Sequence, residues 1–287
     1  MMEVLKTLPR FFIETLKGMR KLAIYQESRF LEDRHRQIYF SQYKFEESIL
    51  LHKIIVSFTT HKERIKYIHY MLDSLYTQTL RPDSVHLYVS EGEYSTYPTI
   101  LERFKPWLKI IETKNIGSYK KFIPALMDAK EGELIVSLDD DFIYPSYLIS
   151  DLYEAFLKKE NALIGHCGFK NKQMFFNGIA GGMGILWNPK IFNPHTMPFF
   201  FDSKLFIDEI GRNYDDGWIT LSCLEQGIEI FCLTEDYFAE RKKFYELPSG
   251  KLYAISSSGK GSNHINKKEK ELLREKTRRI IREHKLI

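Results

Sequence analysis

The sequence lacks several features that mark specialised classes of protein. Its 287 residues include only three cysteines, Cys167, Cys223 and Cys232, and no C-x-x-C pair. So few cysteines, scattered along the chain, exclude a disulfide framework or a cysteine-based zinc site and indicate reduced thiols in the cytosol. No apolar run approaches the ~18 residues of a membrane-spanning helix, and no apolar signal region opens the chain. We therefore expect a cytoplasmic protein, with peripheral membrane contact left open.

Net charge is also small, at +4, but it is unevenly placed. Residues 260–287 hold ten Lys and Arg against four Asp and Glu, a net +6, which leaves −2 for the rest. We predict a basic helix over 266–287, with three interpretations: a solvated helix packed on the domain, an anionic-membrane contact or a nucleic-acid contact. No aromatic residues are interleaved for base stacking, so we do not expect nucleic acid as a partner. Attraction to an anionic inner-leaflet surface fits the charge.

Residues 1–50 have the pattern of amphipathic helices. Apolar residues recur at helical spacing between Leu5 and Met19, with basic residues between them. Such a helical extension can lie on a membrane, bind a partner or fold back onto the following domain.

From residue 53 the pattern changes to alternating strands and helices. This rhythm predicts an α/β fold whose mainly parallel sheet is flanked by helices, with right-handed crossovers. We expect a catalytic domain over 51–265, with a nucleotide-binding half (51–145) and an acceptor half (146–265). The expected strands are 54–58, 84–89, 108–112, 134–138, 164–169, 184–187 and 228–233; the expected helices are 62–78, 119–129 and 214–227.

Three consecutive carboxylates, Asp139, Asp140 and Asp141, follow the most strand-like run of the chain, 133–138. Carboxylates repel one another, so three at a strand end are unfavourable unless cations or hydrogen-bond donors face them. In open α/β sheets, ligands bind outside the carboxyl ends of the strands. The triplet therefore indicates a site for a divalent metal and phosphate, with a solvated acidic turn as the alternative.

Further polar residues follow the other predicted strands. The first strand ends with Ser57, Thr59 and nearby Arg64, which could bind a donor molecule or simply cap a helix. Glu91, at the second strand end, could accept from a nucleobase or ribose or be solvated. Lys120 and Lys121 follow a Gly-Ser turn at a predicted helix start, where amide groups and ammonium groups would converge on an anion.

A second acidic pair, Asp215 and Asp216, opens the helix predicted over 214–227. Two interpretations are open for Asp215 and Asp216: helix capping, which alone explains carboxylates at this position, and a role as catalytic residues. However, a glycine-rich segment that includes Gly181 and Gly182 precedes the pair, and glycines let a backbone approach a ligand closely.

Together these residues predict glycosyl transfer. A metal held by Asp139 and Asp141 would bridge a diphosphate that Lys120 or Lys121 also neutralises, while Asp216 would take a proton from the attacking hydroxyl.

The order of these motifs resembles bacterial GT-A glycosyltransferases of the family-two-like kind found in lipopolysaccharide and capsule assembly. The similarity covers about residues 53–265. It implies the GT-A (nucleotide-diphospho-sugar transferase) fold, and a D-x-D element in which Asp139 and Asp141 hold Mn²⁺ or Mg²⁺ and the sugar nucleotide. It places Thr59 and Glu91 near the nucleoside, and Lys120 or Lys121 near the ribose or phosphates. The motifs that carry the resemblance are 55–60, 74–83, 119–126, 138–145 and 215–218.

The resemblance also implies a donor-sugar loop at Gly181 and Gly182, and a catalytic base, with an inverting mechanism, at Asp216. His264 falls where a late metal-ligating histidine occurs in many GT-A enzymes, although an ordinary loop histidine is the alternative. For Asp140 two interpretations stay open: it faces the donor's ribose or sugar, or it faces solvent.

Our leading hypothesis is a metal-dependent inverting glycosyltransferase of the hexosyltransferase type (EC 2.4). It would use a nucleotide-sugar donor and a glycan or lipid-linked glycan acceptor in cell-surface polysaccharide synthesis. The alternatives are a metal-dependent phosphotransferase or phosphohydrolase and a non-catalytic subunit that binds nucleotide sugars or carbohydrate. The fold does not decide among them, and the donor sugar, nucleobase, linkage and oligomeric state have no readable code in the sequence.

Overall fold

The structure, a computed structural model, describes residues 50–171, 176–236, 245–246 and 267–285. All of them belong to one compact unit, Phe45–Ile287. The helical extension predicted for residues 1–50 lies outside the described residues, except for its last residue. The domain boundaries within the chain stay predictions.

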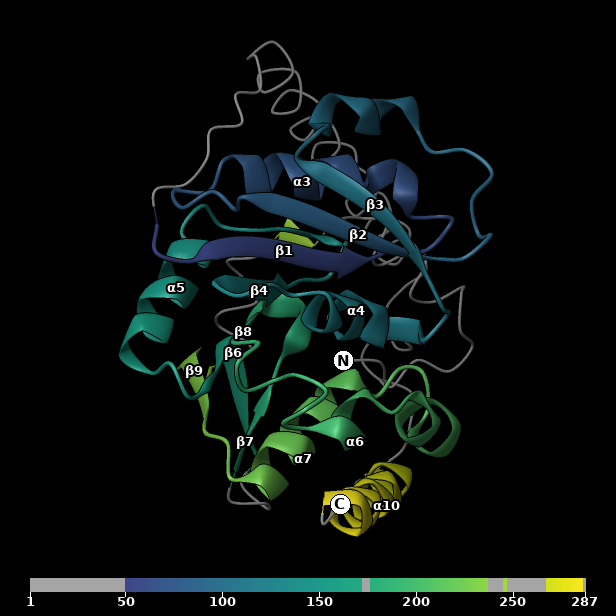
Figure 1. The fold of residues 1–287 in the computed structure, drawn as a ribbon, viewed down its shortest axis with the longest axis vertical. Coiled ribbons are helices and arrows are strands. Elements are labelled where there is room, and N and C mark those ends of the chain that lie inside the picture. Colours follow the sequence, from purple (N-terminus) through teal and green to yellow (C-terminus); the bar gives the residue numbers. More distant parts are fainter. Residues whose placement is uncertain (1–49, 172–175, 237–244, 247–266, 286–287) are drawn as a thin grey trace, which may run out of the picture. The chain divides into compact units, whose positions relative to one another are not determined.

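Four parallel strands form the first half of the central sheet, in the order β3-β2-β1-β4 (Figure 1). The apolar run of β1 is buried at five consecutive positions, as expected for a strand covered on both faces. Helical segments connect the strands, so the predicted alternation is confirmed here. The strands are β1 (Lys53–Thr59), β2 (Ser84–Ser90), β3 (Leu108–Thr113) and β4 (Glu133–Ser137), and the connections contain η1 (Ile65–Tyr67), α3 (Ile68–Tyr76), η2 (Thr99–Phe104), η3 (Gly117–Lys121) and α4 (Ile123–Met127).

The second half of the sheet contains two reversed strands. β8 (Ile185–Trp187) is antiparallel to both β4 and β6 (Leu163–Asn171). The end of β6 pairs with antiparallel β7 (Phe176–Ile179), while β9 (Ile230–Thr234) pairs with β6 in parallel. The mixed α/β class, with a mainly parallel sheet flanked by helices, is therefore confirmed. The other elements are β5 (Phe142–Ile143), which pairs with β10 (Tyr245–Glu246), and α5 (Leu148–Lys158), η4 (Gly181–Met183), α6 (Pro198–Phe201), η5 (Lys204–Ile210), α7 (Asp215–Gln226) and α10 (Lys267–Lys285).

Aromatic side chains join the two halves of the unit. Tyr119 of η3 stacks on Phe206 of η5, with ring centroids 4.4 Å apart, and Phe122 stacks on Trp187 of β8 at 5.1 Å. Trp218, in the second turn of α7, lies against Phe206 at 6.0 Å and is fully buried. Such pairs add roughly 0.5–1.5 kcal/mol each beyond the burial of their area. The cluster therefore fixes η3 and α7, which both carry candidate site residues, relative to the sheet.

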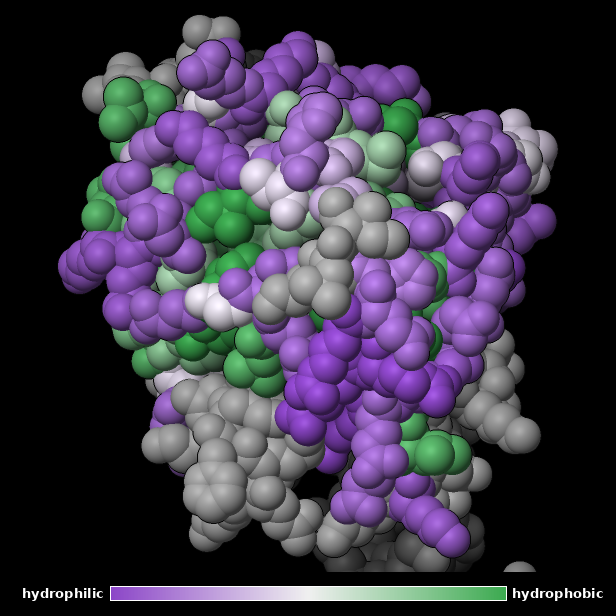
Figure 2. All heavy atoms as spheres, turned by 60° about the horizontal axis from the view of Figure 1, so that its bottom comes forward, coloured by the Kyte–Doolittle hydropathy of each residue, from purple (hydrophilic) through white to green (hydrophobic). Residues whose placement is uncertain are grey.

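Helix α10 packs against α7 through one apolar face. Thr277, Ile280 and Ile281 are buried, and Arg282 binds Glu225 of α7 through two contacts of 2.9 and 3.0 Å. The end of the molecule where α10 lies comes forward in Figure 2, and this face is largely hydrophilic. Among the described helices, none combines the length and apolar character that crossing a bilayer requires.

Candidate functional site

The candidate site lies at the carboxyl ends of β1 and β4. Both strands run in the same direction and end at the same edge, where the amide of Leu138 still donates to the carbonyl of Ser57 at 3.0 Å. The three aspartates begin at the next residue, 139, so they lie at the carboxyl end of the strand, as the sequence pattern predicted.

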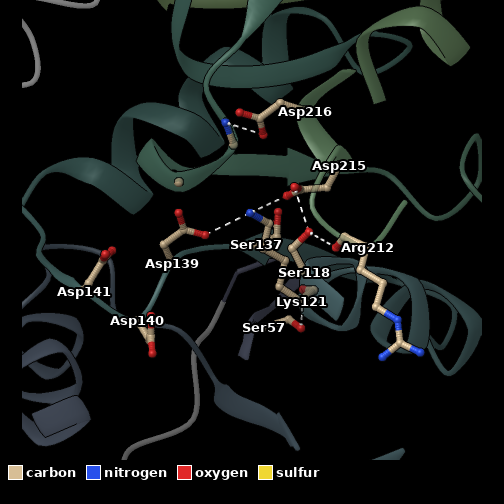
Figure 3. Close-up of polar contacts among 12 residues, drawn as sticks. Ser57, Ser118, Lys121, Ser137, Asp139, Asp140, Asp141, Arg212, Asp215 and Asp216 are labelled. Atoms are coloured by element: carbon tan, nitrogen blue, oxygen red, sulfur yellow. Dashed lines mark hydrogen bonds and ion pairs between the residues drawn. The ribbon is translucent and has the colours of Figure 1, made fainter. Parts of the chain in front are cut away.

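The aspartate triplet does not act as one cluster, because its carboxylates point in different directions (Figure 3). Asp140 is 6% exposed. Its carboxylate accepts a hydrogen bond of 2.5 Å from the Thr60 hydroxyl and forms an ion pair with Arg64. Arg64 also lies 3.1 Å from Oδ2 of Asp141. Asp139 is more open, with 37% of its side chain exposed. Asp140 therefore does not face solvent, and its proposed contact with a donor stays a prediction.

The backbone of Asp139 is fixed by a buried tyrosine that sequence reasoning did not single out. The Tyr144 hydroxyl accepts from the amide of Asp139 at 2.9 Å and lies 2.7 Å from the carbonyl of Gly182, to which it donates. Burial, with the nearby charges of Asp139 and Asp141, raises the pKa of Tyr144 well above its ordinary value, so it stays a neutral donor. Tyr144 thereby ties the triplet to the glycine-rich segment.

Lys121 links the triplet to the second acidic pair. Its ammonium lies 2.9 Å from Oδ1 of Asp139 and 2.7 Å from Oδ2 of Asp215, and only 5% of its side chain is exposed. Burial opposes the charge, but the two carboxylates outweigh it and hold the pKa of Lys121 well above its ordinary value. The lysine therefore stays charged between them.

The two aspartates at the start of α7 have different environments. Asp215 is buried and accepts from Lys121 and, at 2.8 Å, from the Ser118 hydroxyl; these contacts outweigh burial and lower its pKa. Asp216 accepts only a backbone hydrogen bond of 3.1 Å from Gly181 among the contacts described. Burial and the adjacent Asp215 charge raise the pKa of Asp216 to about 7. Both lie in the first turn of the helix, whose N-cap residue is Tyr214.

Two adjacent glycines separate the candidate metal-binding and base carboxylates. A Cβ atom at Gly181 would collide with Oδ1 of Asp216, and one at Gly182 would collide with Oδ2 of Asp139. The backbone can approach both carboxylates only because these positions lack side chains.

The remaining predicted donor-binding residues lie at the same strand edge with different contacts. The ammonium of Lys120, which is buried, donates to Ser90 at 2.6 Å; burial lowers its pKa, with a smaller contribution from Arg212. Thr59 donates to the carbonyl of Tyr88 at 2.8 Å. Ser57 is fully buried and donates to the carbonyl of Lys121 at 2.7 Å. Glu91 is exposed.

The expected helix-start anion site near the two lysines is not formed. Residues 117–121 are a short 3₁₀ segment, and the α-helix begins only at Ile123. The amide and hydroxyl of Ser118 both lie 3.0 Å from the carbonyl of Arg212, which therefore takes the place predicted for an anion. The lysine side chains instead reach neighbouring strand ends and α7. No local sequence signal pairs Ser118 with Arg212, because 94 residues separate them.

Two residues of the triplet are candidate ligands for a divalent cation. Asp139 and Asp141 offer hard carboxylate oxygens, and Asp139 is accessible. Within the described ranges, no group of three or more His, Cys, Asp or Glu side chains is arranged to hold a metal. Mg²⁺ is commonly bound by one or two carboxylates together with substrate phosphates, so the accessible Asp139 carboxylate fits an ion that arrives with a diphosphate. His264 lies outside the described residues.

Comparisons with known proteins give only distant similarities. No protein-family model and no curated protein matches the sequence. A 4-diphosphocytidyl-2C-methyl-D-erythritol synthase from Anaerococcus prevotii aligns at 12% identity and a TM-score of 0.43, covering 65% of this chain and 88% of that one. The structure of GalNAc-T7 with UDP, GalNAc and Mn²⁺ aligns at 14% identity and a TM-score of 0.35, covering 42% of this chain and 23% of that one. Both TM-scores lie below 0.5, so neither structure identifies the activity of this chain.

Proposed function

We propose that this chain is a metal-dependent inverting glycosyltransferase that moves a sugar from a nucleotide-sugar donor to a hydroxyl group. One observation carries the proposal: Gly181 and Gly182 lie against Asp216 and Asp139, respectively. An accessible carboxylate and a carboxylate of raised pKa thus flank one two-glycine turn. Inverting transfer needs this combination, with leaving-group stabilisation on one side and a base on the other.

On the donor side, Asp139 and Asp141 would hold Mn²⁺ or Mg²⁺ together with the donor diphosphate. The cation supplies Lewis-acid stabilisation of the leaving group when bound. The ammonium of Lys120, from η3, reaches Ser90 at the end of β2, in the proposed nucleotide half of the site. Thr59, Arg64 and Glu91 occupy the same edge, and their contacts with the nucleoside or phosphates are part of the proposal.

On the acceptor side, Asp216 acts as the general base. It takes the proton of the acceptor hydroxyl while the oxygen forms a bond to the anomeric carbon. The bond from that carbon to the diphosphate oxygen breaks, and the nucleoside diphosphate leaves with the electron pair. A base with a pKa near the working pH is both available and strong enough to accept the proton, and burial together with Asp215 brings the pKa of Asp216 to about 7.

The acceptor class belongs to the same proposal: a glycan or lipid-linked glycan of cell-surface polysaccharide synthesis, used at the cytoplasmic face of the membrane. Helix α10 would contact an anionic leaflet mainly through its charges, because its apolar residues Ile280 and Ile281 are buried in the domain and Leu272 is the large apolar residue that it exposes among the described side chains. Electrostatic attraction of this kind contributes about 1 kcal/mol per basic residue near the surface.

A screen of nucleotide sugars with and without Mn²⁺, by donor binding and donor hydrolysis, tests the function. Asp141→Ala is expected to lose metal-dependent donor binding. Asp216→Ala is expected to keep donor binding and lose transfer by at least about 100-fold, the scale of one general base.

The outcomes also separate the alternative functions. Release of a nucleoside monophosphate and a sugar phosphate with no sugar transfer would favour a phosphohydrolase, and donor binding without turnover would favour a binding subunit. Normal transfer by both variants would contradict the assigned roles.

A further inference from the structure

Lys121 forms ion pairs with both halves of the candidate site. It lies 18 residues before Asp139 and 94 residues before Asp215 in the chain, yet its ammonium is within 2.9 Å of both carboxylates (Figure 3). The two ends of this bridge differ: the side chain of Asp139 is 37% exposed and that of Asp215 is 11% exposed. Lys121 therefore bridges a partly exposed carboxylate, Asp139, and a buried one, Asp215.

The segment that carries Lys121 is held firmly to the start of α7. The Ser118 hydroxyl donates to Asp215 or to the carbonyl of Arg212, and the Tyr119 hydroxyl donates to the carbonyl of Gly211 at 3.2 Å. Tyr119 is fully buried beneath these contacts. Movement of the Lys121 ammonium therefore acts on the first turn of α7 rather than on a loose loop.

The closed end of the bridge is adjacent to the proposed base. Asp215 immediately precedes Asp216, and both lie in the first turn of α7. The position of Asp216 relative to Asp139 is thus set by two connections: the Gly181–Gly182 turn and the Lys121–Asp215 ion pair.

A cation bound at Asp139 would compete with Lys121 for the same carboxylate. The ammonium would be repelled by that positive charge and would shift its interaction toward Asp215, since attraction between close buried charges is strong where water is scarce. Loading of the donor side would then tighten the start of α7.

We propose that Lys121 is a positioning residue that couples donor binding at Asp139 to the placement of the base Asp216. This inference rests on the proposed function, and it assigns Lys121 a role other than direct binding of the donor phosphates. Asp215 is the second member of the relay and is not itself a base.

Kinetics separate the two roles of Lys121. Lys121→Met removes the competitor for Asp139, so the donor KM is expected to stay the same or fall. The kcat is expected to fall by roughly 10- to 100-fold, the scale of a 1 Å misplacement of a catalytic group. If Lys121 instead binds the diphosphate, the donor KM rises while kcat at saturating donor is kept, and the proposal is overturned. Lys120→Met is the matched control: it removes a neighbouring buried lysine outside the bridge and is expected to affect donor KM.

Amide hydrogen exchange reports the coupling directly. With Mn²⁺ and each common nucleoside diphosphate in turn, exchange of residues 215–218 is expected to slow in the wild-type chain. It should stay unchanged in Lys121→Met, although the nucleotide still binds. Equal slowing in both proteins would refute the relay.

Variants at Asp215 and Asp139, measured by thermal unfolding, keep the test decisive. Asp215→Asn keeps an acceptor for Ser118 and breaks the bridge from its other end, and Lys121→Met/Asp215→Asn leaves no unpaired charge at the buried end. In thermal unfolding, Asp139→Asn and Asp215→Asn should have non-additive effects with Lys121 present and additive effects with methionine there. Additivity with Lys121 present would overturn the relay even if no nucleotide binds, whereas absence of nucleotide binding alone would overturn only the proposed function.

Discussion

Gly182 lies so close to Asp139 that a Cβ at this position would overlap the carboxylate. A second contact connects this turn to the triplet: the Tyr144 hydroxyl hydrogen-bonds to both the carbonyl of Gly182 and the amide of Asp139. The turn therefore sets how the most exposed carboxylate of the triplet faces the strand edge.

This contact predicts different defects for alanine at two adjacent glycines. Gly182→Ala should displace the Asp139 carboxylate and weaken Mn²⁺-dependent donor binding, measured by calorimetry, by about 10-fold or more, since metal ligands tolerate little displacement. Gly181→Ala should displace Asp216 instead, keeping donor binding and lowering kcat. Each variant is the control for the other, and the same defect in both would contradict this division of roles.

The raised pKa of Asp216 predicts the pH dependence of transfer. The base must be ionised, so kcat/KM is expected to rise about tenfold per pH unit below about 7 and to level above it. Asp215→Asn removes one of the charges that raises the pKa of Asp216 and should move this limb to lower pH. Thermal unfolding across the same range shows whether the folded protein persists, and a limb unmoved by the substitution would argue against Asp216 as its source.

The same environment makes Asp216 costly to the fold. Its pKa is raised from 3.8 in the ordinary state to about 7 in the fold, so the folded state holds a proton that the unfolded chain has lost. The free energy of unfolding therefore falls as pH rises from about 4 to 7 and is constant above. Asp216→Asn should raise the melting temperature at pH 8 by several degrees, because a rise in the pKa from 3.8 to about 7 corresponds to an effect on the order of 4 kcal/mol. It should leave the melting temperature unchanged at pH 4, while transfer is lost.

The strands, and the sheet edge at which they end, could be predicted because the sequence signals for them are local. The apolar runs of β1, β2 and β4 are long enough to specify buried strands, and their carboxyl ends meet at one edge by the geometry of parallel sheets. The sequence therefore predicted that Asp139 and Thr59 share a side of the fold. It also predicted a helix over 214–227, and the structure places α7 at Asp215–Gln226.

The side-chain contacts between the strand edge and α7 could not be predicted from the sequence. Lys121 was assigned to phosphates because nothing in its neighbourhood points to Asp139 and Asp215. The direction in which the Lys121 side chain points depends on the aromatic packing of Tyr119 and Phe122, which fixes η3 against η5 and β8. The break at Phe122, where φ is −139°, turns a predicted continuous helix into two short segments. The placement of both lysines follows from that break.

Helix α10 provides a test of the proposed membrane contact. The exposed cations Lys268 and Arg279 lie outside the face that packs on the domain, so Lys268→Glu/Arg279→Glu should leave the melting temperature nearly unchanged. Binding of the full chain to vesicles with phosphatidylserine should fall by at least about 10-fold, because each basic residue lost removes about 1 kcal/mol of attraction. Binding of the unsubstituted chain should also be weak at high salt. Unchanged binding would place any membrane contact elsewhere in the chain.

Arg64 is expected to stabilise the fold as well as the site. It is 12% exposed and pairs with both Asp140 and Asp141, and Asp140 is nearly buried. Arg64→Met would leave the buried Asp140 carboxylate with the Thr60 hydroxyl but no paired cation among the contacts described. Removing one partner of a buried ion pair costs roughly 3 kcal/mol or more, which urea unfolding would measure. Arg64→Met/Asp140→Asn should recover most of that loss, because the asparagine still accepts from Thr60 and carries no charge. Recovery of stability without recovery of donor binding would show that Arg64 also serves the donor site, through Asp141 or by direct contact.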